Sequence, residues 1–342
     1  MSATFDDSDE SKPYATDPEW ADVIPVQQYE GVEPIAPIFY TEEYKDATDY
    51  FRGVVKTGEM SPRVLKLTEE IIHMNPAHYS AWQYRYRTLL ALNSSLEAEL
   101  ELMDSFAIQF LKTYQVWHHR RLLLTALRSV DAAARELAFV ARALRTDAKN
   151  YHTWSYRQWI LAHFNDEDRL WPGELPWVEE LLEEDVRNNS AWHHRFFVVW
   201  QSGVRRGEVD REDVLRRELA FTKEKISLAP NNPSAWNYLR GVLDHTHTPY
   251  ASLTSFVQPY TVAAAPGPTD DSVVDLENPR PSAGAELPCV PALEFLADIY
   301  EAEGGEATPK AVQIWKSLAD ERDTIRKKYW EHRIKDALHG SQ

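Results

Sequence analysis

The sequence predicts an all-α fold, a crescent-shaped α-α superhelix in which a solenoid is built from consecutive helical hairpins. Tryptophans recur at nearly constant spacing through the middle of the chain, and a leucine stands 17 residues before each of them. The 342 residues also include 12 tryptophans and 16 tyrosines beside only 12 glycines, a balance that suits packed helices better than turn-rich β structure. The five recurring tryptophans are Trp82, Trp117, Trp154, Trp192 and Trp236.

The first 40 residues precede the repeats. Residues 1–19 have an acidic, serine-bearing composition, for which we expect a disordered tail. Residues 20–40, WADVIPVQQYEGVEPIAPIFY, carry three prolines among large apolar side chains, which predicts an extended arm that lies against another surface. Helical-hairpin repeats are expected over residues 41–247, and Ser61-Pro62 makes a favourable N-terminus for an early helix.

Each repeat is predicted to be two helices joined by a short turn. In the second helix, four copies carry an arginine three residues after the tryptophan, and all five carry an aliphatic residue seven residues after it, so these positions share one helical face. The first helix shows the same spacing, starting from the leucine. Because one hairpin cannot cover both apolar faces, neighbours must stack, and we expect the arginine stem to lie over a tryptophan between repeats. The four arginines are Arg85, Arg120, Arg157 and Arg195.

The composition changes after the last repeat. Residues 248–291 are rich in Pro, Ala, Gly and Asp, which predicts a long irregular loop. Residues 292–337 are predicted to form C-terminal helices that close the solenoid. Within them, Trp330 and Arg333 keep the three-residue spacing but lack the upstream leucine pattern, as in a divergent capping unit.

The bulk numbers exclude several classes of function. With 37 basic and 54 acidic side chains the formal net charge is −17, which repels both a nucleic-acid backbone and an anionic membrane. Cys289 is the single cysteine, so no disulfide and no cysteine-rich zinc site forms within the chain, as in a reducing, cytoplasmic protein.

Two histidine pairs, His118-His119 and His193-His194, could suggest a metal site. Neighbouring side chains on a helix point about 100° apart, so each pair chelates one ion poorly. No metal site is therefore predicted on this chain.

The turns between the two helices carry residue types that suit an anionic ligand. Lys112 and Lys149 stand five residues before the tryptophan in copies two and three. Equivalent positions in a solenoid lie side by side, so these turns should form one polar ledge, where lysine suits phosphate oxygens and Tyr or His adds donors. The alternative is that Asn and Ser only cap helices while Tyr fills the turn, and the residues alone leave both interpretations open. The ledge comprises Lys112, Tyr114, Gln115, Lys149, Asn150 and His152.

With these residues in place, the chain resembles the α subunit shared by protein farnesyltransferase and geranylgeranyltransferase type I. The resemblance spans Trp20 to Arg333 and rests on the proline-bearing arm, on YKDATDYFRGVV, on NPAHYSAWQYR, KTYQVWHHRR and DAKNYHTWSYRQW, and on DTIRKKYW. It implies a heterodimer with a β subunit that carries zinc and the isoprenoid pocket, with magnesium for farnesyl transfer. The implied substrates are farnesyl or geranylgeranyl diphosphate and CaaX-terminated proteins such as Ras-like or Rho-like GTPases.

The resemblance also implies roles for individual residues. Lys112 resembles the lysine that contacts the prenyl diphosphate and is the expected catalytic residue. Tyr114, Asn150 and His152 match neighbouring positions that line the same site. Gln115 matches the glutamine that meets the C-terminal carboxylate of the CaaX substrate. The expected substrate-binding set is Lys112, Tyr114, Gln115, Lys149, Asn150, His152 and Tyr79.

Two other functions remain open from the sequence. A non-catalytic scaffold of the tetratricopeptide type has a repeat of similar length, although the recurrent Trp-x-x-Arg is foreign to its consensus. The α subunit of a Rab geranylgeranyltransferase shares the tryptophan repeats, and it would act on Rab rather than on CaaX peptides. Prenyl length stays undetermined, because the resemblance assigns that choice to the β subunit.

Overall fold

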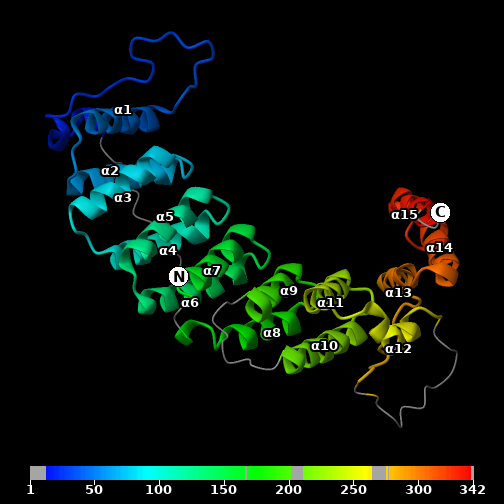
Figure 1. Ribbon diagram of the computed structural model, residues 1–342. Coiled ribbons are helices and arrows are strands. Elements are labelled where there is room, and N and C mark those ends of the chain that lie inside the picture. The colour runs from blue at the N-terminus through cyan, green and yellow to red at the C-terminus, as the bar shows by residue number, and fades with distance from the viewer. Residues whose placement is uncertain (1–12, 166–167, 202–210, 264–274, 276, 340–342) are drawn as a thin grey trace, which may run out of the picture. The chain divides into compact units, whose positions relative to one another are not determined.

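The predicted all-α fold is confirmed. The computed structural model describes residues 13–165, 168–201, 211–263, 275 and 277–339, and this part of the chain contains helices and no strand (Figure 1). The chain divides into two compact units, residues 1–164 and 165–342. No helix in the described ranges is both long and apolar enough to span a lipid bilayer.

The first unit is a series of helical hairpins. Figure 1 shows α2–α3, α4–α5 and α6–α7 as three successive hairpins, each packed against the next, with α1 beside the first. The second helices α3, α5 and α7 lie next to one another, which places the three inter-helix turns in a row. The helices of this unit are α1 Glu42–Thr57, α2 Pro62–Met74, α3 Tyr79–Ala91, α4 Leu96–Gln109, α5 Tyr114–Leu127, α6 Val130–Thr146 and α7 Tyr151–His163.

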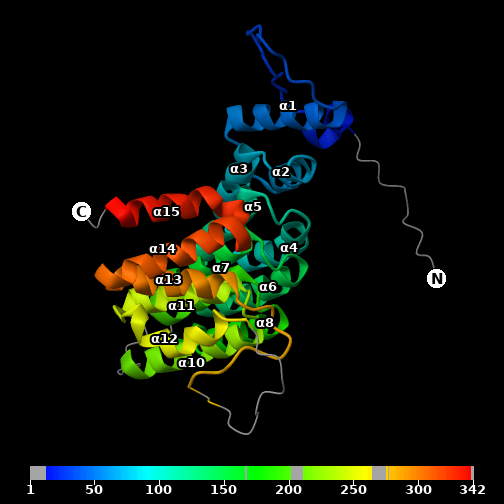
Figure 2. The same cartoon turned by 90° about the vertical axis from the view of Figure 1, so that its right-hand side faces the viewer.

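The second unit also contains helical hairpins, α8–α9 and α10–α11, and it ends in a small group of helices. In both views α13, α14 and α15 stack in sequence (Figure 2). A π-helical turn, Phe197–Gln201, extends α9. The helices are α8 Glu174–Glu184, α9 Asn189–Phe196, α10 Arg211–Leu228, α11 Pro233–Thr246, α12 Thr254–Val257, α13 Val290–Glu303, α14 Thr308–Ser317 and α15 Lys327–His339.

The recurring tryptophans close the turn of each hairpin. Each indole is nearly or fully buried, and its Nε1–H donates a hydrogen bond to the backbone carbonyl six residues earlier, in the turn after the first helix. A helix end leaves carbonyls without helical partners, so the indole both fills the core and pairs one of these groups. The carbonyls are those of Pro76, Leu111, Ala148, Val186 and Pro230, at 2.8–2.9 Å from the indole nitrogens.

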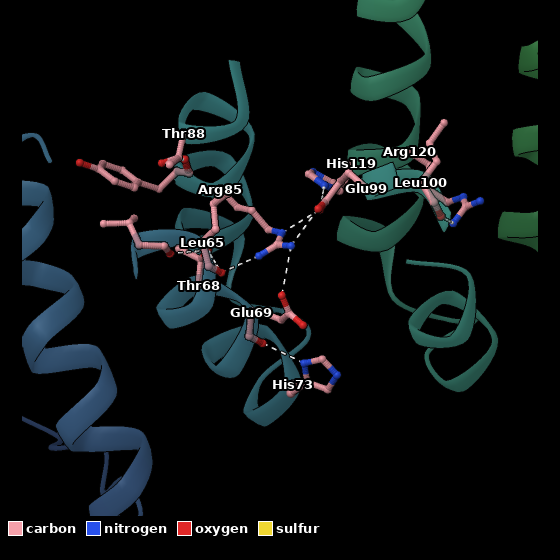
Figure 3. Close-up of polar contacts among 12 residues, drawn as sticks. Leu65, Thr68, Glu69, His73, Arg85, Thr88, Glu99, Leu100, His119 and Arg120 are labelled. Atoms are coloured by element: carbon pink, nitrogen blue, oxygen red, sulfur yellow. Dashed lines mark hydrogen bonds and ion pairs between the residues drawn. The ribbon is translucent and has the colours of Figure 1, made fainter. Parts of the chain in front are cut away.

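The sequence predicts that the arginines three residues later stack on these tryptophans, but in the described contacts Arg120 and Arg195 lie over Phe139 and Phe221. Instead, Arg85 pairs with Glu99 of the next repeat, at 2.7 Å from Nε to Oε1, and its Nη1 donates to the backbone carbonyl of Leu65 at 2.6 Å (Figure 3). Arg120 makes the same pair with Glu136, at 2.5 Å from Nη2 to Oε1, and its guanidinium stacks over Phe139. The guanidinium therefore links repeats through buried ion pairs, because a carboxylate, rather than an indole face, lies within its reach.

The sequence signal for these pairs is a glutamate 18 residues before the tryptophan. It occurs in copies two to five, at Glu99, Glu136, Glu174 and Glu218. Each of these glutamates also accepts a hydrogen bond from a residue of its own hairpin, two positions after the tryptophan. The donors are His119 to Glu99 and His194 to Glu174, both at 2.9 Å, and Tyr156 to Glu136 and Tyr238 to Glu218, both at 2.6 Å.

His119 makes one of these networks sensitive to acid. Its side chain is buried beside Arg85 and Arg120, and burial holds the pKa of the imidazole below its usual value. Burial opposes ionisation of Glu99, but hydrogen bonds from His119 and Arg85 hold the pKa of this carboxyl below its usual value. The folded state thus favours neutral His119. In the unfolded chain the same imidazole takes up a proton once the pH falls below about 6.5, so acid favours the unfolded state.

We expect the protein to lose stability between pH 7.5 and 5.5, and His119→Tyr to weaken this loss. Tyrosine occupies the equivalent position in two other repeats, where it donates to the equivalent glutamate, and it does not titrate in this pH range. Thermal unfolding at several pH values measures the effect, with exposed His332→Gln as the control. An acid sensitivity that His119→Tyr leaves unchanged would contradict this assignment.

The chain before α1 corrects the predicted tail of residues 1–19. Residues 1–12 lie outside the described residues, but Tyr14–Thr16 and Pro18–Trp20 are short 3₁₀ helices packed on α1. The rings of Tyr14 and Trp20 lie 5.1 Å apart, and both contact Tyr50 of α1. Arg63 covers the Trp20 ring at 4.9 Å. Tyr14 and Trp20 bury enough aromatic area to order this segment, which the acidic composition of residues 1–19 did not indicate.

The arm of residues 20–40 is anchored at its start and exposed beyond. Val23 is buried, and the Val26 backbone N–H donates to the Asp49 carbonyl of α1 at 3.0 Å. Gly53, in the middle of α1, has the Ile24 carbonyl so close that any Cβ at this position would collide with it. Further along, the side chains of Ile24, Val32, Ile35, Ile38 and Phe39 are exposed.

The segment 248–291 is more ordered than the irregular loop that the sequence predicted. Three short helices, Tyr250–Leu253, α12 and Gln258–Tyr260, pack against α13 because Leu253, Phe256 and Tyr260 are buried. The Tyr260 hydroxyl also donates to the Pro279 carbonyl at 2.7 Å. Residues 264–274 and 276 of the predicted loop lie outside the described residues.

The C-terminal helices follow the prediction for residues 292–337 with small shifts, since α13 begins at Val290 and α15 ends at His339. Trp330 is fully buried, and Arg333 donates to Asp298 of α13 at 2.8 Å. This tryptophan and arginine therefore repeat, within a different helix arrangement, the core and ion-pair roles that the repeats show.

Candidate functional site

Two neighbouring turns of the first unit meet at a lysine. Lys112 lies in the turn between α4 and α5, and its Nζ is 4.0 Å from Oδ2 of Asp147 in the turn between α6 and α7. Leu111 anchors the first turn, because its side chain is buried and its carbonyl accepts the Trp117 indole N–H. The Lys112 side chain itself is 84% exposed, so the fold holds the backbone and leaves the ammonium in solvent.

The ring of Tyr114 lies against that of His152. The two centroids are 4.3 Å apart in an edge-to-face arrangement, which joins the first turn of α5 to the first turn of α7. Partial burial holds the pKa of His152 below its usual value, so its imidazole is neutral at neutral pH and offers one N–H donor. Tyr151 is exposed beside it, with its ring centroid 5.5 Å from that of His152.

Asn150 takes the capping role that was the alternative for these turns. It is buried, and its Oδ1 accepts hydrogen bonds from the backbone N–H and the hydroxyl of Thr153, at 3.0 and 3.1 Å. Its amide nitrogen donates to Asp147 at 3.3 Å. Asn150 therefore positions the turn that carries Lys149 and His152, and Lys149 is exposed in that turn.

A groove of about 450 Å³ opens along α3, α5 and α7. Four of the predicted substrate-binding residues line it: Tyr79, Tyr114, Gln115 and His152. None of the described residues that line it carries a carboxylate, although the chain as a whole is strongly acidic. The groove therefore suits an anionic or aromatic ligand better than a cationic one. The remaining lining residues are Trp117, His118, Arg121, Tyr151, Ser155 and Tyr156.

Sequence reasoning missed part of this lining. His118 and Arg121 follow Tyr114 at four and seven residues, which is one face of α5. The recurring tryptophan and arginine mark another face of the same helix, so their spacing gives no signal for this one. The sequence signal for this face is the i, i+4, i+7 spacing of Tyr114, His118 and Arg121.

No metal centre is formed by the described residues, since they contain no group of three or more His, Cys, Asp or Glu side chains placed to hold an ion. The polar groups of the groove are hydroxyl, amide, imidazole and guanidinium groups. These groups donate hydrogen bonds to oxygen anions.

Comparisons with known proteins agree with this architecture. The family described as "Protein prenyltransferase alpha subunit repeat" matches residues 61–92, 96–127, 133–164, 171–202 and 215–246, which are the five tryptophan repeats. The chain is 34% identical, over 96% of its length and 95% of the relative, to the "Protein farnesyltransferase/geranylgeranyltransferase type-1 subunit alpha" of Dictyostelium discoideum.

A solved structure is similar over nearly the whole chain. It is described as "Candida albicans protein geranylgeranyltransferase-I complexed with GGPP", and it matches with a TM-score of 0.76 and 28% identity, covering 92% of this chain and 97% of the other. The "Geranylgeranyl transferase type-2 subunit alpha" of Mus musculus is 32% identical, but over only 58% of this chain and 37% of the relative. The repeats and this extended similarity show that the chain belongs to the α-subunit family of protein farnesyltransferase/geranylgeranyltransferase type-1.

Proposed function

We propose that the chain, in a cytoplasmic heterodimer with a β subunit, transfers a farnesyl or geranylgeranyl group from its diphosphate to the cysteine thiol of a C-terminal CaaX motif. The convergence of two turns at Lys112 supports this proposal most directly. The groove beside it, lined by donors and without a carboxylate, is consistent with an anionic substrate. A protein geranylgeranyltransferase-I bound to GGPP is also the structural relative described above.

Lys112 would stabilise the leaving group of the reaction. Breaking the allylic carbon–oxygen bond sends the electron pair to the diphosphate oxygen, and the substrate sulfur forms the new bond to that carbon. An ammonium already placed beside the oxygen stabilises the growing negative charge more in the transition state than in the ground state. The pair with Asp147 is long and exposed, and such pairs contribute about 0–1 kcal/mol. Lys112 can therefore exchange this carboxylate for a diphosphate at little cost.

Tyr114 and His152 would add directional hydrogen bonds at the same end of the groove. Their rings contact each other, so each limits the rotation of the other side chain. The hydroxyl of Tyr114 and the single N–H of neutral His152 are donors suited to diphosphate oxygens. Tyr79 borders the groove from α3, and Lys149 adds a second exposed cation from the α6–α7 turn. We assign these residues to binding and Lys112 to the chemical step.

In this proposal the β subunit carries the zinc ion, and farnesyl transfer also uses magnesium. A zinc ion lowers the pKa of a coordinated thiol and so keeps a substrate cysteine as thiolate. The described residues of this chain form no group of three or more His, Cys, Asp or Glu side chains that could hold a metal ion.

Gln115 is the proposed contact for the carboxylate at the end of the CaaX peptide. Its side chain lines the groove, and its amide nitrogen can donate to that charged group. We expect Gln115→Ala to raise KM for the peptide, with kcat/KM lower by about ten- to hundred-fold, because a hydrogen bond to a charged group is worth roughly 1.5–3 kcal/mol. Steady-state kinetics with varied peptide measure it.

A matched control and a second substitution sharpen this test. Gln313→Ala removes an exposed glutamine of α14 and should leave the kinetics unchanged. Gln115→Glu places a like charge against the carboxylate and should cost more than alanine. If Gln115→Ala and Gln115→Glu both leave the KM for the peptide unchanged, Gln115 does not bind the C-terminal carboxylate of the peptide.

Assembly distinguishes this function from that of a repeat scaffold. A subunit with a large partner interface should gain stability and yield when co-expressed with its β subunit, whereas a scaffold should be equally soluble alone. Copurification with a β subunit followed by a comparison of CaaX peptides with Rab proteins separates the type-1 proposal from the Rab alternative. A chain that is soluble and stable alone and does not bind the β subunit would contradict the proposed function.

A further inference from the structure

One cation in the groove remains unexplained by the proposed chemistry. Arg121 of α5 holds its guanidinium over the ring of Trp159 in α7, at 4.8 Å from the ring centroid. Trp159 is itself fixed within a stack, with Tyr156 at 5.8 Å and an interplanar angle of 11°, and His163 at 4.8 Å and 20°. The guanidinium therefore lies on an indole ring that is itself stacked with two further rings.

Arg121 has no acidic partner within the described part of the chain. The other arginines of this unit that were described above, Arg85, Arg120 and Arg63, each form at least one ion pair there. The groove lined by Arg121 has no carboxylate among its described residues, and Arg121 is exposed. Among the described residues, the Arg121 guanidinium thus lies on an aromatic ring without an anionic partner, although the chain has a formal charge of −17.

The diphosphate at Lys112 is not the anion that matches this position. Arg121 lies seven residues after Tyr114 on α5, which is about 10 Å along a helix axis. Trp159 lies eight residues after Tyr151 on α7, about 12 Å along its axis, and the stack directs Arg121 toward that end. The cation is therefore held about two helical turns from the turns that carry Lys112.

We propose that the Arg121–Trp159 pair is a docking point for a carboxylate side chain of the β subunit. This inference rests on the proposed function and names one contact of its heterodimer. A planar guanidinium with one face on an indole still has its edge N–H groups available for a carboxylate, and it binds that group in a bidentate manner. Arg, Trp and Tyr are also the residue types on which interface energy concentrates. An acidic side chain of the β subunit would neutralise the positive charge of Arg121.

The test is the affinity of the two subunits for each other. Arg121→Gln keeps the first three side-chain carbons and removes the charged guanidinium, and it should raise the Kd of the heterodimer by about tenfold or more, with a weaker dependence of Kd on salt. Arg121→Lys should recover only part of the affinity, because lysine lacks the planar edge. Trp159→Leu should weaken binding as well, since it removes the platform.

The control is Arg135→Gln on α6, which removes the same charge from an exposed arginine already paired with Glu97 and should leave Kd unchanged. If Kd and its salt dependence stay the same in Arg121→Gln while KM for an acidic CaaX peptide rises, the anion belongs to the substrate and the inference is wrong. Failure of the unsubstituted chain to bind the β subunit would instead contradict the proposed function.

Discussion

Replacing Lys112 with alanine is expected to lower kcat of the heterodimer by tens- to hundreds-fold, the order of magnitude seen when one preplaced donor to a developing anion is removed. The physical reason is that the ammonium gains most from the charge that grows on the departing diphosphate. Because the side chain is 84% exposed and its neighbouring carboxylate is 4.0 Å away, its loss should not disturb the fold. Single-turnover kinetics with the copurified heterodimer measure the chemical step without product release.

Two further variants test the role of the charge at Lys112. Lys112→Arg keeps a cation with a different shape and should retain part of the rate. Lys56→Ala removes an exposed lysine at the end of α1 and should have no effect on kcat. An unchanged kcat in Lys112→Ala would exclude this lysine from the site.

Replacing Arg120 with alanine is expected to lower the free energy of unfolding by about 3–5 kcal/mol, because it leaves Glu136 buried without its counter-charge. Arg120 is fully buried, and besides Glu136 it binds Asp104 at 2.7 Å and the Leu100 carbonyl at 3.2 Å. Its removal breaks three links between helices at once. Chemical denaturation of the heterodimer, followed by tryptophan fluorescence and circular dichroism, measures the loss.

Arg135→Ala is the matched control for this substitution. Arg135 also pairs with a glutamate on a neighbouring helix, but both side chains are about half exposed, and such pairs contribute about 0–1 kcal/mol. Equal destabilisation by the two substitutions would show that the buried pairs do not hold the repeats together.

The repeats were predictable because packing leaves a periodic signal. A tryptophan that must fill each hairpin core, with its leucine 17 residues earlier, recurs even where the surface sequence varies. The glutamates that pair with the arginines were also periodic, but isolated glutamates on helices are usually solvated, and their burial became evident only when the neighbouring repeat was in place. The spacing within one repeat thus predicts its hairpin. Contacts between repeats are predictable only when the sequences of two neighbouring repeats are considered together.

For the candidate site, sequence alone separates ligand-binding residues from helix caps less clearly than it identifies the repeats. Lys112 stood out because packing does not require a lysine in this turn. Asn150 was expected to line the ligand site, yet it is buried as a helix cap, and sequence alone did not separate these roles. The spacing within α5 places Arg121 on the same face as Tyr114, but its position over Trp159 depends on how the two hairpins pack, which one helix alone does not reveal.

The most direct measurement for this account is prenyl transfer by the purified chain, its β subunit and the two together, with labelled farnesyl and geranylgeranyl diphosphates and a CaaX peptide. We predict that transfer requires both subunits and uses at least one of the two diphosphates. A stable complex that transfers neither group to a CaaX peptide, or a chain that forms no such complex, would contradict it.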